Sequence, residues 1–134
     1  MATTKKRISS PQVPEPPPQT WSNCLVVGDQ VWIAGMVARD GATVIGGDSM
    51  YEQARAVFAK IKHLMEAAGG RMDDIVKVLI FVTDIKRREE VWKARREVFT
   101  GDFPTSTLVE VRALAAPELL VEVEAVAVLG AGGR

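Results

Sequence analysis

The chain has 134 residues, of which 47% are hydrophobic, which is enough for one domain with a buried core. Its 17 basic residues balance 17 acidic residues, so the net charge gives no reason to expect a polyanionic partner such as nucleic acid. No apolar run approaches the roughly 18 residues of a membrane-spanning helix, the amino terminus lacks the apolar core of a secretory signal, and the single Cys24 cannot form an internal disulfide. We therefore expect a cytoplasmic protein with no nucleic-acid or membrane partner.

The first 20 residues are rich in proline and poor in apolar side chains. Prolines cannot donate the hydrogen bonds of a strand ladder, and the segment has little surface to bury. It is therefore predicted to be an extended or disordered arm over residues 1–20, followed by one domain over residues 21–130. The alternative is a polyproline-type recognition segment.

The domain is predicted to open with a β-hairpin. Trp21–Val27 and Gln30–Ala34 are β-rich runs, and the Gly-Asp pair between them is a two-residue turn signal. Ala42–Ile45 lies between glycine-containing turns and predicts a turn or a small extra strand. These glycines do not form a phosphate-binding pattern, because no Gly-Lys-Ser/Thr or Gly-x-Gly-x-x-Gly follows.

A helix is predicted to begin at Ser49, which with Glu52 three residues later forms a capping box. An apolar stripe at three- and four-residue spacing continues to Ala68, and two glycines then end the helix. His63, the only histidine, lies off this stripe and is predicted to be a surface residue. With one histidine and one cysteine, the sequence predicts neither a zinc nor an iron site, and no cofactor.

Ile75–Val82 is a dense β-branched run, typical of a central strand that is covered on both faces. The acidic pair before it, Asp73 and Asp74, suits a solvated loop, with a metal site as the alternative. A second helix is predicted over about Arg87–Phe99, with its apolar positions facing inward and its basic residues mostly facing water.

The last quarter of the chain contains two apolar runs separated by a short Ala/Pro/Glu connection, and these predict a strand pair. In the second run, residues 121, 123, 125 and 127 share one face, while Glu122 and Glu124 share the other. Two carboxylates on one face of an apolar strand indicate either a solvated rim or a functional site. The element order predicts an α+β sheet with both helices on one face, so that the other face needs cover.

Pro104 with three small residues after it, a Val/Glu-rich strand and the final Val-Glu-Val-Glu-Ala-Val-Ala resemble the carboxyl-terminal signature of the Rid family, also called YjgF-like. The resemblance runs from about residue 21 to residue 128. It implies a chorismate-mutase-like single domain, a homotrimeric barrel and ligand clefts between subunits. It also implies hydrolytic deamination of enamines and imines without a cofactor.

The resemblance places Glu122 at the family glutamate that helps to position the attacking water; the alternative is a structural carboxylate that accepts hydrogen bonds from backbone N–H groups. Ser106 stands where deaminating members have an arginine that grips the substrate carboxylate, and a serine offers no charge. Arg95 and Arg112 are candidate replacement cations, with a solvated helix face and a strand end as the alternatives. The residues implied to bind substrate are Trp21, Gly35, Trp92, Ser106 and Thr107; for Trp21 and Trp92 the alternative is a packing role.

Two functions follow from these residues. Glu122, together with the aromatic positions Trp21 and Trp92, favours an enamine or imine deaminase acting on a conjugated or aromatic substrate. The missing arginine favours a non-catalytic trimer that binds a small molecule. A ribonuclease, a function attached to some family members, has the least support, because the sequence contains neither paired histidines nor a basic face with interleaved aromatics.

Overall fold

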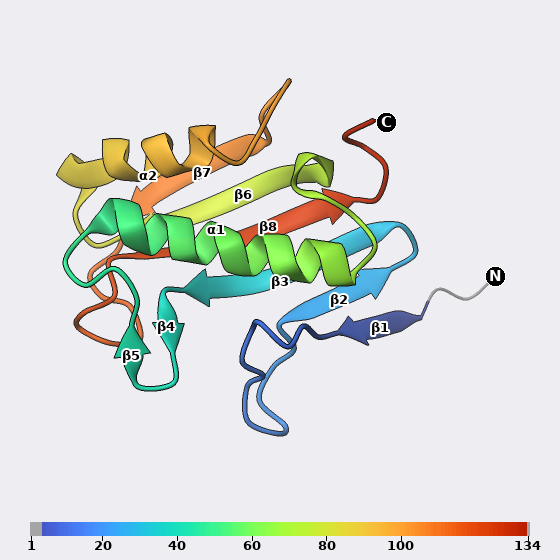
Figure 1. Cartoon of the computed structure of the whole chain (residues 1–134), viewed down its shortest axis with the longest axis horizontal. Coiled ribbons are helices and arrows are strands. Elements are labelled where there is room, and N and C mark those ends of the chain that lie inside the picture. The colour runs from blue at the N-terminus through green and yellow to red at the C-terminus, as the bar shows by residue number, and fades with distance from the viewer. Residues whose placement is uncertain (1–3, 134) are drawn as a thin grey trace.

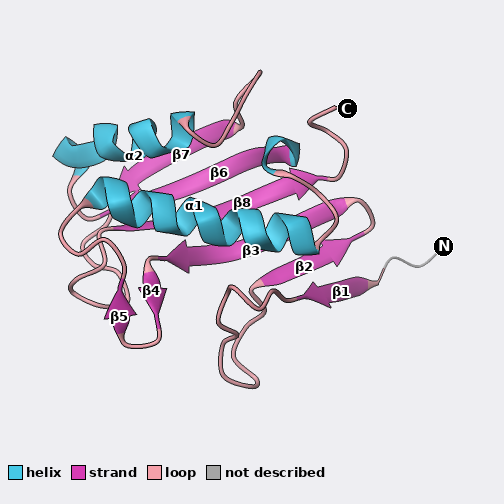
Figure 2. Ribbon diagram, viewed as in Figure 1, coloured by secondary structure: helices cyan, strands magenta, loops and turns pink. Residues whose placement is uncertain are grey.

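The computed structural model describes residues 4–133 as a six-stranded mixed sheet with two α-helices on one of its faces (Figures 1 and 2). This α+β architecture is the one predicted. In spatial order the strands are β1 (Lys5–Ile8), β2 (Cys24–Val27), β3 (Gln30–Val37), β8 (Val121–Val128), β6 (Ile75–Val82) and β7 (Thr105–Glu110). The helices are α1 (Met50–Ala67) and α2 (Arg88–Arg96), and the short 3-10 turns are η1 (Met72–Asp74) and η2 (Ile85–Arg87).

The connections explain why both helices share a face. Strands β3 and β6 are each antiparallel to β8, so they run parallel to one another, and α1 makes the crossover between them. Strands β6 and β7 pair in parallel, with α2 as their crossover. Because such crossovers are almost always right-handed, two of them made in the same direction place both helices on the same side.

Residues 1–20 were predicted to be an extended or disordered arm; residues 1–3 lie outside the described part, and residues 4–20 include a strand and a buried side chain. Lys5–Ile8 forms β1, which pairs antiparallel with β2 at the edge of the sheet. Val13, in the proline-rich part, is only 4% exposed and packs in the core. Charged side chains on an edge strand protect its free hydrogen-bonding groups from other chains, which is why β1 carries no apolar alternation that would reveal it.

The predicted hairpin is present, with Val27 paired to Gln30 and Gly28 at a φ of 63° in the turn. The register of β3 against β8 shifts between Ile33 and Met36, so a β-bulge interrupts the ladder there. The short extra strand predicted near residues 42–45 is β5 (Thr43–Val44), which pairs only with β4 (Arg39–Asp40).

Helix α1 begins as predicted, because the Ser49 side chain accepts a hydrogen bond of 3.1 Å from the Glu52 N–H. The reciprocal half of the capping box is replaced by a backbone bond from the Ser49 N–H to the Gly46 carbonyl at 3.0 Å. The apolar stripe is fully buried from Ala54 to Met65, and Ala68 at its end is partly exposed. Within residues 4–133, no helix combines the length and the apolar character needed to span a membrane.

One expectation for the strands is wrong. The last two strands are not a pair, since β6 lies between β7 and β8. Strand β6 is central as predicted; within residues 4–133 the helices cover one of its faces, and Val76 is 39% exposed. The alternation in β8 is confirmed, because Val121, Val123, Ala125 and Ala127 are at most 2% exposed while the residues between them are partly exposed.

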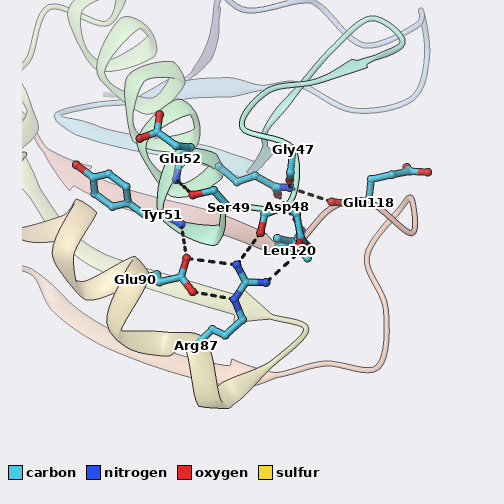
Figure 3. Close-up of polar contacts among 10 residues, drawn as sticks. Gly47, Asp48, Ser49, Tyr51, Glu52, Arg87, Glu90, Glu118 and Leu120 are labelled. Atoms are coloured by element: carbon cyan, nitrogen blue, oxygen red, sulfur yellow. Dashed lines mark hydrogen bonds and ion pairs between the residues drawn. The ribbon is translucent and has the colours of Figure 1, made fainter.

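A polar network fixes the start of α2 against the start of α1 (Figure 3). The guanidinium of Arg87 contacts both carboxylate oxygens of Glu90 and donates to the Asp48 carbonyl at 2.7 Å. Glu90 in turn accepts a bond of 3.1 Å from the Tyr51 N–H at the first turn of α1. The hydrogen bonds to Arg87 hold the pKa of Glu90 below its ordinary value. The network thus orients α2, the helix that carries Trp92.

Candidate functional site

The central carboxylate of the site is Glu122 on β8. It is partly buried on the sheet face opposite the helices. Burial, and to a smaller extent the neighbouring Glu124, raises the pKa of Glu122 above its ordinary value of 4.5. No cation forms an ion pair with Glu122 in the described part of the chain. A desolvated, uncompensated carboxylate is a proton-transfer group whose pKa lies nearer neutrality than usual.

Gly35 makes room for this carboxylate. It lies in the β3 bulge, and a β-carbon added to it would lie 2.8 Å from Cδ of Glu122. Any side chain at position 35 would therefore push the carboxylate aside. Bulges often lie beside active sites because they re-aim local groups. The structure therefore places these two predicted residues side by side.

A hollow of about 530 Å³ opens beside the carboxyl-terminal half of β3 and includes Trp21 and Gly35 in its lining. Trp21 is 55% exposed and donates from Nε1 to Asn23 Oδ1 at 3.2 Å. Asn23 also donates to the Pro14 carbonyl at 2.9 Å, which ties the proline-rich segment to the sheet. The other lining residues are Val13, Pro14, Glu15, Pro16, Pro17, Asn23, Met36, Val37, Arg39, Gly41 and Lys60.

A second group of predicted residues lies between α2 and β7. Ser106 faces the helix layer and accepts a hydrogen bond of 2.8 Å from Nη1 of Arg95. The guanidinium carbon of Arg95 lies 6.0 Å from the centre of the Trp92 ring, within reach of a cation–π interaction. Burial lowers the pKa of Arg95, and the adjacent Arg96 adds a smaller lowering by charge repulsion.

The register of the sheet separates these two groups within one chain. Phe81 on β6 pairs with Glu122 on one side and with Val109 on the other, so the β7 residue level with Glu122 is three positions beyond Ser106. Ser106 faces the helices, whereas Glu122 lies on the opposite face. One chain therefore does not bring all the predicted site residues into a single cleft.

The remaining candidate site residues lie on separate elements and do not form a group. Thr107 is exposed and shares a cross-strand row with Leu79 and Glu124, two strands away. Arg112 is exposed beyond the end of β7. His63 lies on α1 with a side chain that is 39% exposed, 4.0 Å from Glu66. Among residues 4–133, no three histidine, cysteine or carboxylate side chains are grouped so that they could hold a metal ion.

Sequence reasoning missed two parts of this arrangement. The proline-rich segment forms one wall of the hollow, although its composition suggested an arm apart from the domain. Lys60 of α1 lies in the same lining and donates to the carbonyl of Val37 at 2.9 Å and of Arg39 at 2.5 Å. Burial lowers the pKa of Lys60. A lysine off the apolar stripe carries no local signal for this contact, because the contact depends on where β3 ends.

The fold is of the chorismate-mutase-like, YjgF-type class. A structure of a protein of unknown function from Pseudomonas aeruginosa superposes with a TM-score of 0.86 and 38% identity, covering 96% of this chain and 94% of that one. A RidA structure from an Antarctic Psychrobacter species gives a TM-score of 0.81 with 27% identity, covering 92% and 99% of the two chains.

Residues 13–129 match the family described as Endoribonuclease L-PSP, so the chain belongs to that family. A RutC family protein of Pyrococcus abyssi is 31% identical over 109 residues, which cover 80% of this chain and 84% of the relative. The 2-iminobutanoate/2-iminopropanoate deaminase of Dermatophagoides farinae is 29% identical over 127 residues, covering 93% and 97% of the two chains. The Rid-like resemblance predicted from the carboxyl-terminal motif is thereby confirmed.

Proposed function

We propose that the protein hydrolyses an enamine or imine and releases ammonia, with Glu122 as the group that orients the attacking water. The observation that carries this proposal is the desolvated Glu122 carboxylate, which has no cationic partner among residues 4–133 and is accommodated by the bare backbone of Gly35. A full-length relative named for 2-iminobutanoate/2-iminopropanoate deamination supports the same reaction class.

The chemistry requires one water and one proton donor. Water adds to the carbon of the protonated C=N bond, the resulting amino alcohol loses ammonia, and a carbonyl product remains. A carboxylate with a raised pKa accepts a proton from the water and returns it to the departing nitrogen. Glu122 therefore serves as base in the first step and as acid in the second.

Aromatic side chains favour a conjugated substrate. Trp21 lines the hollow beside Gly35, and Trp92 lies beside Ser106 in the second group. Indole faces stack on planar ligands and contribute contact area with little loss of side-chain freedom. We therefore expect a planar enamine or imine larger than 2-iminobutanoate to be turned over faster than 2-iminobutanoate itself.

The proposal includes a homotrimer. The sheet face opposite the helices has no second layer in one chain, and its apolar side chains include Trp32, 48% exposed, and the partly exposed Leu79 and Val126. A sheet with one bare apolar face is stabilised by packing that face on another layer. Association of three copies would also allow Glu122 of one copy to meet Trp92 and Ser106 of another in a cleft between subunits.

The experiment supplies 2-iminobutanoate, 2-iminopropanoate and a set of conjugated imines, each generated in the assay by an amino-acid oxidase, and measures ammonia release. Wild type is expected to accelerate release from at least one, and Glu122→Gln to lose that acceleration. Glu118→Gln is the matched control, because its side chain points away from the Gly47–Leu120 contacts (Figure 3) and makes none of the ion pairs of the described residues. Wild-type release at the uncatalysed rate with every substrate would contradict the proposal.

Ser106 favours a second candidate, a trimer that binds a small molecule without turning it over. A serine on β7 supplies neither the charge nor the fork of a guanidinium. This candidate predicts that a ligand raises the melting temperature in a saturable way with no product formed. Multiple turnover by the purified protein would exclude it.

The family description names an endoribonuclease, which is a property of other members. The only histidine of this chain, His63, lies on α1, away from Ser106 and Glu122. The site thus offers a carboxylate without an imidazole beside it, an arrangement that suits water addition to an imine better than attack by a ribose hydroxyl.

A further inference from the structure

Arg95 is a cation with no carboxylate partner among residues 4–133. Its Nη1 donates to Ser106, but its Nε is buried and has no hydrogen-bond partner. None of the ion pairs within residues 4–133 includes Arg95. Buried donors are nearly always paired, so an orphaned one calls for a specific explanation.

Arg87 shows what a structural arginine looks like in this protein. Its guanidinium contacts both carboxylate oxygens of Glu90 and donates to the carbonyl of Asp48, so its charge has a fixed internal partner. Arg95 lies two turns further on, in α2, and it meets a neutral hydroxyl and an indole ring instead of a carboxylate. The difference indicates that the counter-charge of Arg95 comes from outside residues 4–133.

The surroundings of Arg95 reinforce its positive character. Arg88 lies over the same Trp92 ring at 5.4 Å, and Arg96 repels the Arg95 charge strongly enough to help lower its pKa. A partly desolvated guanidinium attracts an anion more strongly than one in bulk water does, because the local dielectric is lower. A planar carboxylate fits the guanidinium fork, and a conjugated chain attached to it would lie along the Trp92 ring.

The geometry points to Arg95, with Ser106 as its hydroxyl partner and Trp92 as its aromatic wall, as the subsite for the carboxylate of a planar, conjugated acid. This inference rests on the proposed function, since it names the part of the substrate that the α2–β7 half of the site would hold. It assigns to a helix residue the charge that Ser106 on β7 does not supply. The substrate class becomes an imine or enamine conjugated to a carboxylic acid.

The test uses benzoate and benzamide as probes, because they share a planar ring and differ in charge. Binding to the full chain is measured by calorimetry. Wild type is expected to bind benzoate at least about 10-fold more tightly than benzamide. Arg95→Met, which keeps an unbranched stem, should lose about 10- to 100-fold of the benzoate affinity and leave benzamide unchanged. The benzoate affinity of Arg95→Lys should lie between those of wild type and Arg95→Met, since lysine keeps the charge without the guanidinium fork.

Arg55→Met, the same change at an exposed position of α1, is the matched control and should bind benzoate as wild type does. Melting temperatures of the free variants confirm that each is folded. Equal benzoate affinity in wild type and Arg95→Met, or no preference of wild type for benzoate, would overturn the inference. Glu122→Gln should still bind benzoate, so loss of turnover with retained binding separates the carboxylate subsite from the proposed hydrolysis.

Discussion

Gly35 and Glu122 lie so close together that a side chain at position 35 would clash with the carboxylate, since a β-carbon on the glycine would lie 2.8 Å from Cδ of the glutamate. The β3 bulge brings the backbone of Gly35 to this point, and the absence of a side chain lets the carboxylate stay partly buried. The relationship makes Gly35 a positioning residue for Glu122.

Gly35→Ala should therefore impair the reaction more than the fold. The atoms that a new methyl group meets belong to the flexible end of Glu122, so the free energy of unfolding should change by no more than about 1 kcal/mol. Displacing the carboxylate by about 1 Å should lower kcat/KM for the best substrate about 10- to 100-fold. Urea unfolding and ammonia release provide the two measurements.

A double-mutant cycle supplies the control for this variant. In a Glu122→Ala background the carboxylate is gone, so adding Gly35→Ala should cost no further stability. An equal cost in both backgrounds would show that position 35 is sensitive for a reason unrelated to Glu122.

The raised pKa of Glu122 predicts a pH-dependent stability. Because the folded state favours the protonated carboxyl, the stabilisation is present below pH 4.5 and is lost as the pH rises through the elevated pKa. The melting temperature of Glu122→Gln should thus exceed that of wild type by an amount that grows with pH above 4.5. Glu118→Gln, the same change at an exposed position before β8, is the matched control. A pH-independent difference for Glu122→Gln would contradict the burial argument.

Gln53 is fully buried and joins α1 to the segment before β8. Its Nε2 donates to the carbonyls of Gly47 and Glu118 at 2.7 Å and 2.9 Å, and its Oε1 accepts from the Leu120 N–H at 2.9 Å. Gln53→Glu replaces both donated bonds with repulsion and should lower the free energy of unfolding by about 2–4 kcal/mol at pH 7.

Gln12→Glu is the matched control for Gln53→Glu, since it makes the same chemical change at an exposed position. Its free energy of unfolding, measured in urea, should differ from that of wild type by no more than about 0.5 kcal/mol. Comparable losses for the two variants would show that added charge, rather than the buried network, sets the cost.

The uncovered sheet face predicts the oligomeric state. Wild type should sediment as a trimer, and Val126→Lys, at the partly exposed middle of that face, should sediment as a smaller species because lysines from several copies would be forced together. Ala59→Lys places the same charge on the exposed side of α1 and should leave the trimer intact. A wild-type monomer at working concentration would contradict the assembly and the shared cleft.

Local patterns predicted the elements well, because their causes are local. The Ser49 cap, the turn at Gly28 and the alternation through β8 each follow from a few neighbouring residues. The order of the strands in the sheet could not be predicted from local patterns. The insertion of β8 between β3 and β6 depends on contacts far apart in the chain, so the two final apolar runs looked like a pair although β6 separates them.

The site residues likewise divide into those that local patterns predicted and those that depend on contacts between distant segments. The pattern of β8 and the family resemblance both singled out Glu122, and the structure places Gly35 against it. The contact between Arg95 and Ser106 could not be read from spacing, because it requires α2 to pack beside β7. The role of residues 13–17 as a wall was hidden for a similar reason, since proline content describes backbone restriction and says nothing of what the segment packs against.

Mixing two inactive variants tests most directly whether the hydrolytic site is shared between copies. Glu122→Gln and Arg95→Met are expected to be inactive alone, and after equal amounts are unfolded and refolded together, about a quarter of the clefts should combine an intact Glu122 from one copy with an intact Arg95 from its neighbour. Ammonia release should then return to about a quarter of the wild-type rate. A mixture no more active than the separate variants, although scattering shows mixed trimers, would contradict a cleft built from two copies.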